Sequence, residues 1–236
     1  MFGVRRKIAA VNAATNSGDT RVTKGWMRVL GVDPAAVGPT GFGIIESDGR
    51  RCRTLCYGTL NVNVERRKAS AGAALQDIHA SLCRLMDEFY PHAIAVESVF
   101  TALNMRTALR LAEVRGVVLL AAAQHGLEVH SYAPREVKAY VTGHGHADKK
   151  QMQLMVQALL SMPVTPEPAD AADALAVALC HLQVEQARQR FGLPDKREGV
   201  PKPRALAIAA NATRTPATYR AGGATRTRPS RIVSPR

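Results

Sequence analysis

Four acidic residues occupy positions where a folded chain could gather them in one place. Asp33 ends the apolar run at 28–33, and Glu97 directly follows the apolar run at 93–96. Asp170 and Asp173 stand three residues apart in an Ala-rich segment, so on a helix they share one face. Taken singly, these acids could be exposed at strand ends and at a helix start. Taken together, with no basic residue inside their motifs, they favour a divalent cation.

Carboxylate oxygens are ligands that suit Mg²⁺ or Mn²⁺. Acids embedded among small apolar residues are costly unless a cation meets them, and Asp170 and Asp173 have such a setting. Two ions about 3.5–4 Å apart would activate a water and stabilise the leaving oxygen of a phosphodiester. The acids therefore predict metal-dependent phosphodiester hydrolysis.

The apolar pattern predicts the elements that would position these acids. Apolar runs at 28–33, 42–46 and 54–62, with a turn signal at Asp48-Gly49, predict three antiparallel strands. Two further strands are expected at 93–96 and 129–132, and helices at 75–89, 107–124, from 134, at 148–161 and at 169–186.

This order of elements predicts an α/β fold. Its mixed β-sheet would start antiparallel and continue with parallel strands, with helices on both faces. In such sheets the carboxyl ends of buried strands face the ligand crevice, which would bring Asp33 and Glu97 together.

Charge divides the 236 residues into three parts. Residues 1–27 carry five Lys and Arg against one acid, residues 187–236 carry twelve against two, and residues 28–186 are close to neutral. After Val200 the chain is rich in proline and has little apolar periodicity, which predicts disorder. We expect one domain at 28–186 between a basic, disordered N-terminal extension (1–27) and a basic, disordered C-terminal tail (187–236). Basic flanks on a neutral domain favour nucleic acid as the partner.

The remaining features exclude some classes of protein. No apolar run approaches the ~18 residues of a membrane span, so an integral membrane protein is excluded. The four cysteines form no Cys-x-x-Cys pair, which argues against a zinc ribbon and favours the reduced thiols of a cytoplasmic protein. His144 and His146 have no third ligand in view, so we expect a polar loop there. Met27, just before the first strand, is an alternative to Met1 as the natural start.

Several motifs, taken in order along the chain, resemble the RuvC family of bacterial Holliday-junction resolvases. The motifs are Leu30-Gly31-Val32-Asp33-Pro34, Thr40-Gly41-Phe42-Gly43-Ile44-Ile45, Ala95-Val96-Glu97-Ser98-Val99-Phe100, Ala108-Leu109-Arg110-Leu111, Arg115-Gly116-Val117, Arg135-Glu136-Val137-Lys138 and Ala169-Asp170-Ala171-Ala172-Asp173-Ala174-Leu175-Ala176. They span about residues 28–186. A lone Gly-x-Asp would be weak support, whereas an ordered set that includes Glu-x-Val-Phe and Asp-Ala-Ala-Asp-Ala is specific.

The resemblance implies a ribonuclease-H-like fold and a homodimer. Its two active sites would nick opposite strands of four-way junction DNA in recombination and DNA repair, with RuvA and RuvB as branch-migration partners. Two Mg²⁺ ions per site are implied, with Mn²⁺ as a substitute. The implied catalytic and metal-binding residues are Asp33, Glu97, Asp170 and Asp173. The DNA-binding candidates are Phe100, which would probe the junction core, Lys138 and Lys149, which would contact phosphates, and the adjacent Lys150.

Two other functions stay open from the sequence. A sugar-kinase or actin-type ATP-dependent kinase also opens with a strand, an Asp and a Gly-bearing hairpin, but it needs a second domain and a second phosphate loop. A catalytically inactive DNA-binding protein of the same fold is the other alternative, although all four acids are present. A nuclease assay on a synthetic four-way junction, with and without Mg²⁺, separates the three.

Overall fold

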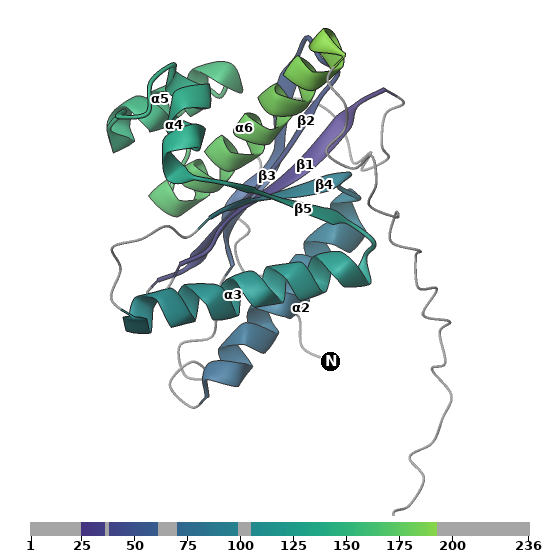
Figure 1. Ribbon diagram of the computed structural model, residues 1–236, viewed down its shortest axis with the longest axis vertical. Coiled ribbons are helices and arrows are strands. Elements are labelled where there is room, and N and C mark those ends of the chain that lie inside the picture. The colour runs from purple at the N-terminus through teal and green to yellow at the C-terminus, as the bar shows by residue number, and fades with distance from the viewer. Residues whose placement is uncertain (1–24, 36–37, 61–69, 99–104, 193–236) are drawn as a thin grey trace, which may run out of the picture. The chain divides into compact units, whose positions relative to one another are not determined.

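The computed structural model describes residues 25–35, 38–60, 70–98 and 105–192 and is built on one five-stranded sheet (Figure 1). The strands lie in the order β3-β2-β1-β4-β5. Their bounds are β1 (Met27–Asp33), β2 (Thr40–Ser47), β3 (Cys52–Leu60), β4 (Ala93–Glu97) and β5 (Glu128–Tyr132). The first three strands pair antiparallel, whereas β4 pairs parallel with β1 and β5 pairs parallel with β4. The predicted mixed sheet, antiparallel and then parallel, is confirmed.

Helices lie on both faces of the sheet, as the order of elements predicted (Figure 1). One face carries α2 (Ala71–Phe89) and α3 (Met105–Gln124), and the other carries α4 (Pro134–Thr142), α5 (Lys149–Leu159) and α6 (Ala169–Phe191). Each face has its own apolar core, because side chains alternate along a strand. In β1, Leu30 and Val32 belong to the core under α2 and α3, whereas Val29 belongs to the core under α6.

The helix ends have local causes. Helix α2 ends at Phe89; its cap residue Tyr90 takes a left-handed conformation, and Pro91 follows. Helix α6 continues to Phe191, past the expected end at residue 186. Arg188 pairs with Glu185 along this last stretch at 3.3 Å, and Gly192 caps the helix at φ 59. Among the described residues, no helix combines the length and apolar character needed to cross a membrane.

Helix α6 packs very closely on strands β1 and β2. A methyl group added to Gly31 would lie 2.0 Å from the carbonyl oxygen of Ala174, and one added to Gly41 would lie 1.9 Å from that of Asp170. At Gly43 it would lie 2.6 Å from the side chain of Leu175. Three glycines in two neighbouring strands therefore let the backbone of α6 rest directly on the sheet.

Substitution at one of these glycines tests this packing. We expect Gly31→Ala to lower the free energy of unfolding by about 1–3 kcal/mol or more, because backbone atoms of α6 cannot yield to the added methyl group. Gly72→Ala is the matched control, because a methyl group there meets only the Ser70 hydroxyl at 3.6 Å. Urea unfolding of both variants measures the difference. Equal stabilities would show that α6 can shift at little cost.

Candidate active site

Strand pairing brings Asp33 and Glu97 together. Strands β1 and β4 are parallel neighbours, and Val32 pairs with Val96 at the last paired position. Asp33 and Glu97 are the next residues of the two strands, and a hydrogen bond joins their side chains. Two carboxyl groups therefore meet at the carboxyl edge of the parallel strands, where the sequence placed them.

The start of α6 adds the other two acids. Asp170 lies in the first turn and Asp173 one turn later, and both are half-buried. The carbonyl oxygen of Asp170 rests over Gly41, one strand away from Asp33. Both helix acids act electrostatically on Asp33. Because α6 packs closely on the sheet, Asp170 and Asp173 lie near the ends of β1 and β4.

The pKa values of Asp33, Glu97 and Asp173 are all raised, because the three carboxyl groups are partly buried and lie close together. Burial, followed by the nearby charges of Glu97 and Asp173, raises the pKa of Asp33 from 3.8 to about 8. Burial also raises the pKa of Glu97 and is the largest effect there. The hydrogen bond with Asp33 acts in the opposite direction and lowers it. Burial raises the pKa of Asp173 as well, and Lys149 opposes it. Such a group of carboxylates is stabilised by a cation.

Two of the predicted lysines face these acids. Lys138 in α4 and Lys149, the first residue of α5, both lower the pKa of Glu97 and of Asp173. The start of α5 is fixed by Asp148, whose side chain accepts a hydrogen bond of 2.8 Å from the backbone of Gln151. This cap places Lys149 at the rim of the site.

The donor set fits a hard divalent cation. All four acids offer carboxylate oxygens, the ligands that Mg²⁺ and Mn²⁺ prefer. Within the described part of the chain, however, no three His, Cys, Asp or Glu side chains form a ready-made metal cluster. The charges of the four acids nevertheless act on one another.

The structure gathers six of the eight predicted site residues: Asp33, Glu97, Asp170, Asp173, Lys138 and Lys149. Lys150 is exposed beside Lys149, and Phe100 lies outside the described residues. His144 and His146 are exposed in the turn between α4 and α5, as expected for a polar loop.

Sequence reasoning missed Tyr132, which pairs with Glu97 in the sheet, and His181, with which its hydroxyl forms a hydrogen bond of 2.7 Å. The available signal was spacing: His181 follows Asp170 by eleven residues and so lies on the same face of α6.

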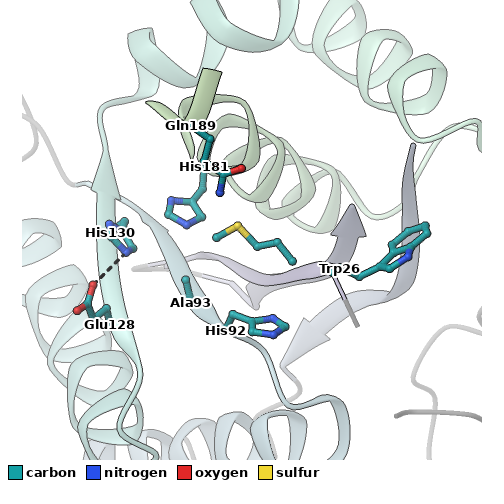
Figure 2. A pocket seen from close by; sticks show the side chains of 9 residues that line it. Trp26, His92, Ala93, Glu128, His130, His181 and Gln189 are labelled. Atoms are coloured by element: carbon teal, nitrogen blue, oxygen red, sulfur yellow. Dashed lines mark ion pairs between the residues drawn. The ribbon is translucent and has the colours of Figure 1, made fainter. Parts of the chain in front are cut away.

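A pocket of about 280 Å³ lies elsewhere, at the amino ends of the parallel strands (Figure 2). Met27, Ala93 and Glu128 line it, and they are the first residues of β1, β4 and β5. The acids stand at the opposite ends of these strands, so this pocket is separate from the candidate active site.

Comparison with known proteins agrees with this geometry. A family model for the crossover junction endodeoxyribonuclease RuvC matches residues 29–181. The protein of that name from Koribacter versatilis (strain Ellin345) is 46% identical over 165 residues, covering 70% of this chain and 98% of the relative. That from Parafrankia sp. (strain EAN1pec) is 44% identical over 179 residues, covering 74% and 98%. The T. thermophilus RuvC in complex with Holliday junction substrate is similar at a TM-score of 0.64 and 33% identity, covering 68% of this chain and 96% of that one.

The raised pKa of Asp33 predicts how stability depends on pH in the metal-free protein. The folded protein keeps the Asp33 proton up to about pH 8, whereas the unfolded chain loses it near 3.8. The folded state therefore binds more protons in this range, and stability is lost as the pH rises towards 8. Asp33→Asn cannot ionise, so we expect its melting temperature in EDTA to exceed that of the wild type at pH 8 by at least about 2 °C.

The difference between Asp33→Asn and the wild type should shrink as the pH falls to 4, because the unfolded chain also binds the Asp33 proton near its pKa of 3.8. Calorimetry across this range measures it. Glu88→Gln, which removes an exposed carboxyl on α2, is the control and should show no such pH-dependent difference. A difference in melting temperature between Asp33→Asn and the wild type that stays constant from pH 4 to 8 would contradict the raised pKa of Asp33.

Proposed function

The chain belongs to the RuvC family of crossover junction endodeoxyribonucleases, and from this premise we propose that it resolves four-way (Holliday) DNA junctions by paired, metal-dependent nicks. The observation that carries the proposal is the convergence of strand-end and helix-start acids from three elements: Asp33, Glu97, Asp170 and Asp173. This convergence disfavours an inactive DNA-binding protein. The family match across the domain disfavours the kinase alternative.

We propose Mg²⁺ as the cofactor, two ions per active site, with Mn²⁺ able to substitute. The residues that would hold the ions are Asp33, Glu97, Asp170 and Asp173. When bound, such ions activate water for in-line attack and stabilise the leaving oxygen, which gives 5′-phosphate and 3′-hydroxyl ends.

The chain's own residues supply position and charge. Asp33 keeps its proton at neutral pH in the metal-free protein, so cation binding would displace that proton. Lys138 and Lys149 add positive charge beside the acids, where a phosphate backbone would lie. We further propose that Lys150 contacts phosphate and that Phe100, three residues after Glu97, probes the junction core.

Removal of either strand-end acid tests the chemistry. We expect Asp33→Asn and Glu97→Gln to reduce cleavage of a synthetic four-way junction in Mg²⁺ by more than about 100-fold, since each removes charge that stabilises the reacting centre. Junction binding without metal should persist in both variants. It should tighten slightly in Glu97→Gln, which presents less negative charge to phosphate, and stay near wild type in Asp33→Asn, because Asp33 is already protonated at neutral pH without metal. Gel assays of cleavage and binding separate the two effects.

Glu88→Gln serves as the control for Glu97→Gln, because Glu88 is an exposed residue of α2. It should cleave like the wild type. Near wild-type cleavage by either active-site variant would overturn the assignment of these acids.

Paired nicks need two active sites, and we propose that a homodimer supplies them. One face of α3 is exposed and apolar along its whole length; we call these residues the α3 stripe: Met105, Leu109, Ala112, Gly116, Leu119, Leu120 and Ala123. A methyl group added to Gly116 would meet nothing within 4 Å. A helix with small residues between larger ones suits close crossing by a second copy of itself. As further partners we propose RuvA and RuvB, on family resemblance, and as location the cytoplasm.

A charge placed in the α3 stripe tests the dimer. Leu120 is 53% exposed, and Leu154 on α5 is 50% exposed, so Leu120→Glu and Leu154→Glu are a matched pair. We expect Leu120→Glu to give a folded monomer in light scattering, because a buried unpaired carboxylate would oppose association. The Leu154→Glu variant should still show the mass of a dimer in light scattering. The reverse result would place the interface on α5.

We propose that the basic tail beyond the domain tethers the protein to DNA without reading its sequence. Residues 193–236 carry ten Lys and Arg against two acids, and they contain none of the four acids of the active site. A basic segment of this composition recognises the phosphate backbone by charge and not the shape of a junction.

Truncation after Gly192, the cap of α6, tests the tail. The truncated protein should keep metal-dependent junction cleavage at low salt. Its binding to plain duplex should weaken, and the salt slope should become shallower by about 0.9 for each phosphate that the tail neutralises in the full chain. Fluorescence anisotropy at several salt concentrations measures this. An unchanged slope would exclude the tether.

A further inference from the structure

Tyr132 joins the strand that carries Glu97 to the helix that carries Asp173. Its backbone pairs with Glu97 in the sheet, and its carbonyl oxygen accepts a hydrogen bond of 2.8 Å from the backbone N–H of Ser98. Its hydroxyl forms a hydrogen bond of 2.7 Å with Nδ1 of His181 in α6. Tyr132 therefore contacts both β4 and α6, the strand and the helix that carry Glu97 and Asp173.

His181 lies on the acid-bearing face of α6. It follows Asp170 by eleven residues, a spacing at which an α-helix returns to nearly the same face. The side chain is 1% exposed. Its ring also stacks on His130 of β5, with 4.4 Å between the ring centroids, and Figure 2 shows the two rings side by side between helix and strand. Both β5 contacts therefore fix the position of one side chain of α6.

The glycine contacts do not fix the position of α6 relative to β4 and β5. Gly31, Gly41 and Gly43 belong to β1 and β2, so they set how closely α6 approaches those two strands. The separation between Asp173 and Glu97 also depends on how the helix sits against β4 and β5. Tyr132 is paired with Glu97 in the sheet, and its contact on α6 lies eight residues beyond Asp173, about 12 Å along the helix. This contact between α6 and β5 is placed to set how the helix lies against those strands.

We infer that the hydrogen bond between Tyr132 and His181 is a positioning contact, which holds the acids of α6 against Glu97 and thereby sets the affinity of the active site for divalent cations. The inference rests on the proposed function of the four acids. Burial raises the pKa of Tyr132, so its hydroxyl stays protonated and can form the hydrogen bond with Nδ1 of His181. Groups that orient the ligands of a metal ion without touching the ion affect its affinity, so this contact can act on metal binding.

The test removes the hydroxyl and measures metal binding directly. We expect Tyr132→Phe to weaken Mn²⁺ binding by about 3–10-fold in calorimetric titration of the DNA-free protein, the effect of removing one buried hydrogen bond. The Mg²⁺ concentration for half-maximal junction cleavage should rise by a similar factor. Cleavage at saturating Mg²⁺ and metal-free junction binding should stay close to wild type. Tyr57→Phe is the matched control, because Tyr57 lies in β3, away from β4 and β5.

Substitution of the partner separates positioning from general stability. The amide of His181→Asn can still accept a hydrogen bond from Tyr132, whereas His181→Ala cannot. Both variants shorten a buried side chain, so both should lose stability, and titrations are run well below each melting temperature. We expect His181→Asn to bind Mn²⁺ more tightly than His181→Ala, which should match Tyr132→Phe.

Two results would overturn the inference. One is wild-type Mn²⁺ affinity in folded Tyr132→Phe, and the other is an equal drop in affinity in His181→Asn and His181→Ala. A wild-type protein that neither binds Mn²⁺ nor cleaves junctions would instead overturn the proposed function itself. The wild-type titration therefore distinguishes the two failures.

Discussion

The direct contact between the backbone of α6 and the backbone of β1 and β2 is the constraint on which the active site depends. Gly31 and Gly41 carry no side chain, so the carbonyl oxygens of Ala174 and Asp170 rest where a methyl group would otherwise lie. A helix that sits this deep is buried around most of its circumference, which accounts for its run of alanines. The same depth carries the first turn of the helix to the edge of the sheet where Asp33 ends its strand.

This packing holds the carboxyl groups of the active site close together although their negative charges repel one another. Asp33 and Glu97 end strands, and Asp173 lies in the second turn of a helix, so none of the three sits on a loop that could swing away. Burial, together with repulsion from Glu97 and Asp173, raises the pKa of Asp33 to about 8, so protonation of Asp33 relieves part of the repulsion. A bound cation would relieve it differently, by releasing that proton. Rigid placement of the carboxylates thus couples metal binding to pH.

Much of this arrangement could be predicted from the sequence, because its signals are local. Apolar runs that end in an acid predicted β1 and β4, and the three-residue spacing of Asp170 and Asp173 predicted a shared helix face. The end of α6 at Phe191 was missed, because it depends on a left-handed cap at Gly192. The contact between Tyr132 and His181 was missed because it joins side chains 49 residues apart, and no local pattern marks such a pair.

The distribution of charge follows from the chemistry of the site. Four acids and two lysines leave the metal-free site negative, so it repels a phosphate backbone, and bound cations would reverse this sign. The domain at 28–186 is itself close to neutral and offers little long-range attraction to DNA. The net positive charge of the chain lies in the two flanks, and the DNA tether that we propose for the C-terminal flank would add to the attraction of Lys138 and Lys149. Such a tether would let the domain keep the carboxylates that hydrolysis needs, because the surface around them would not have to supply all of the affinity for DNA.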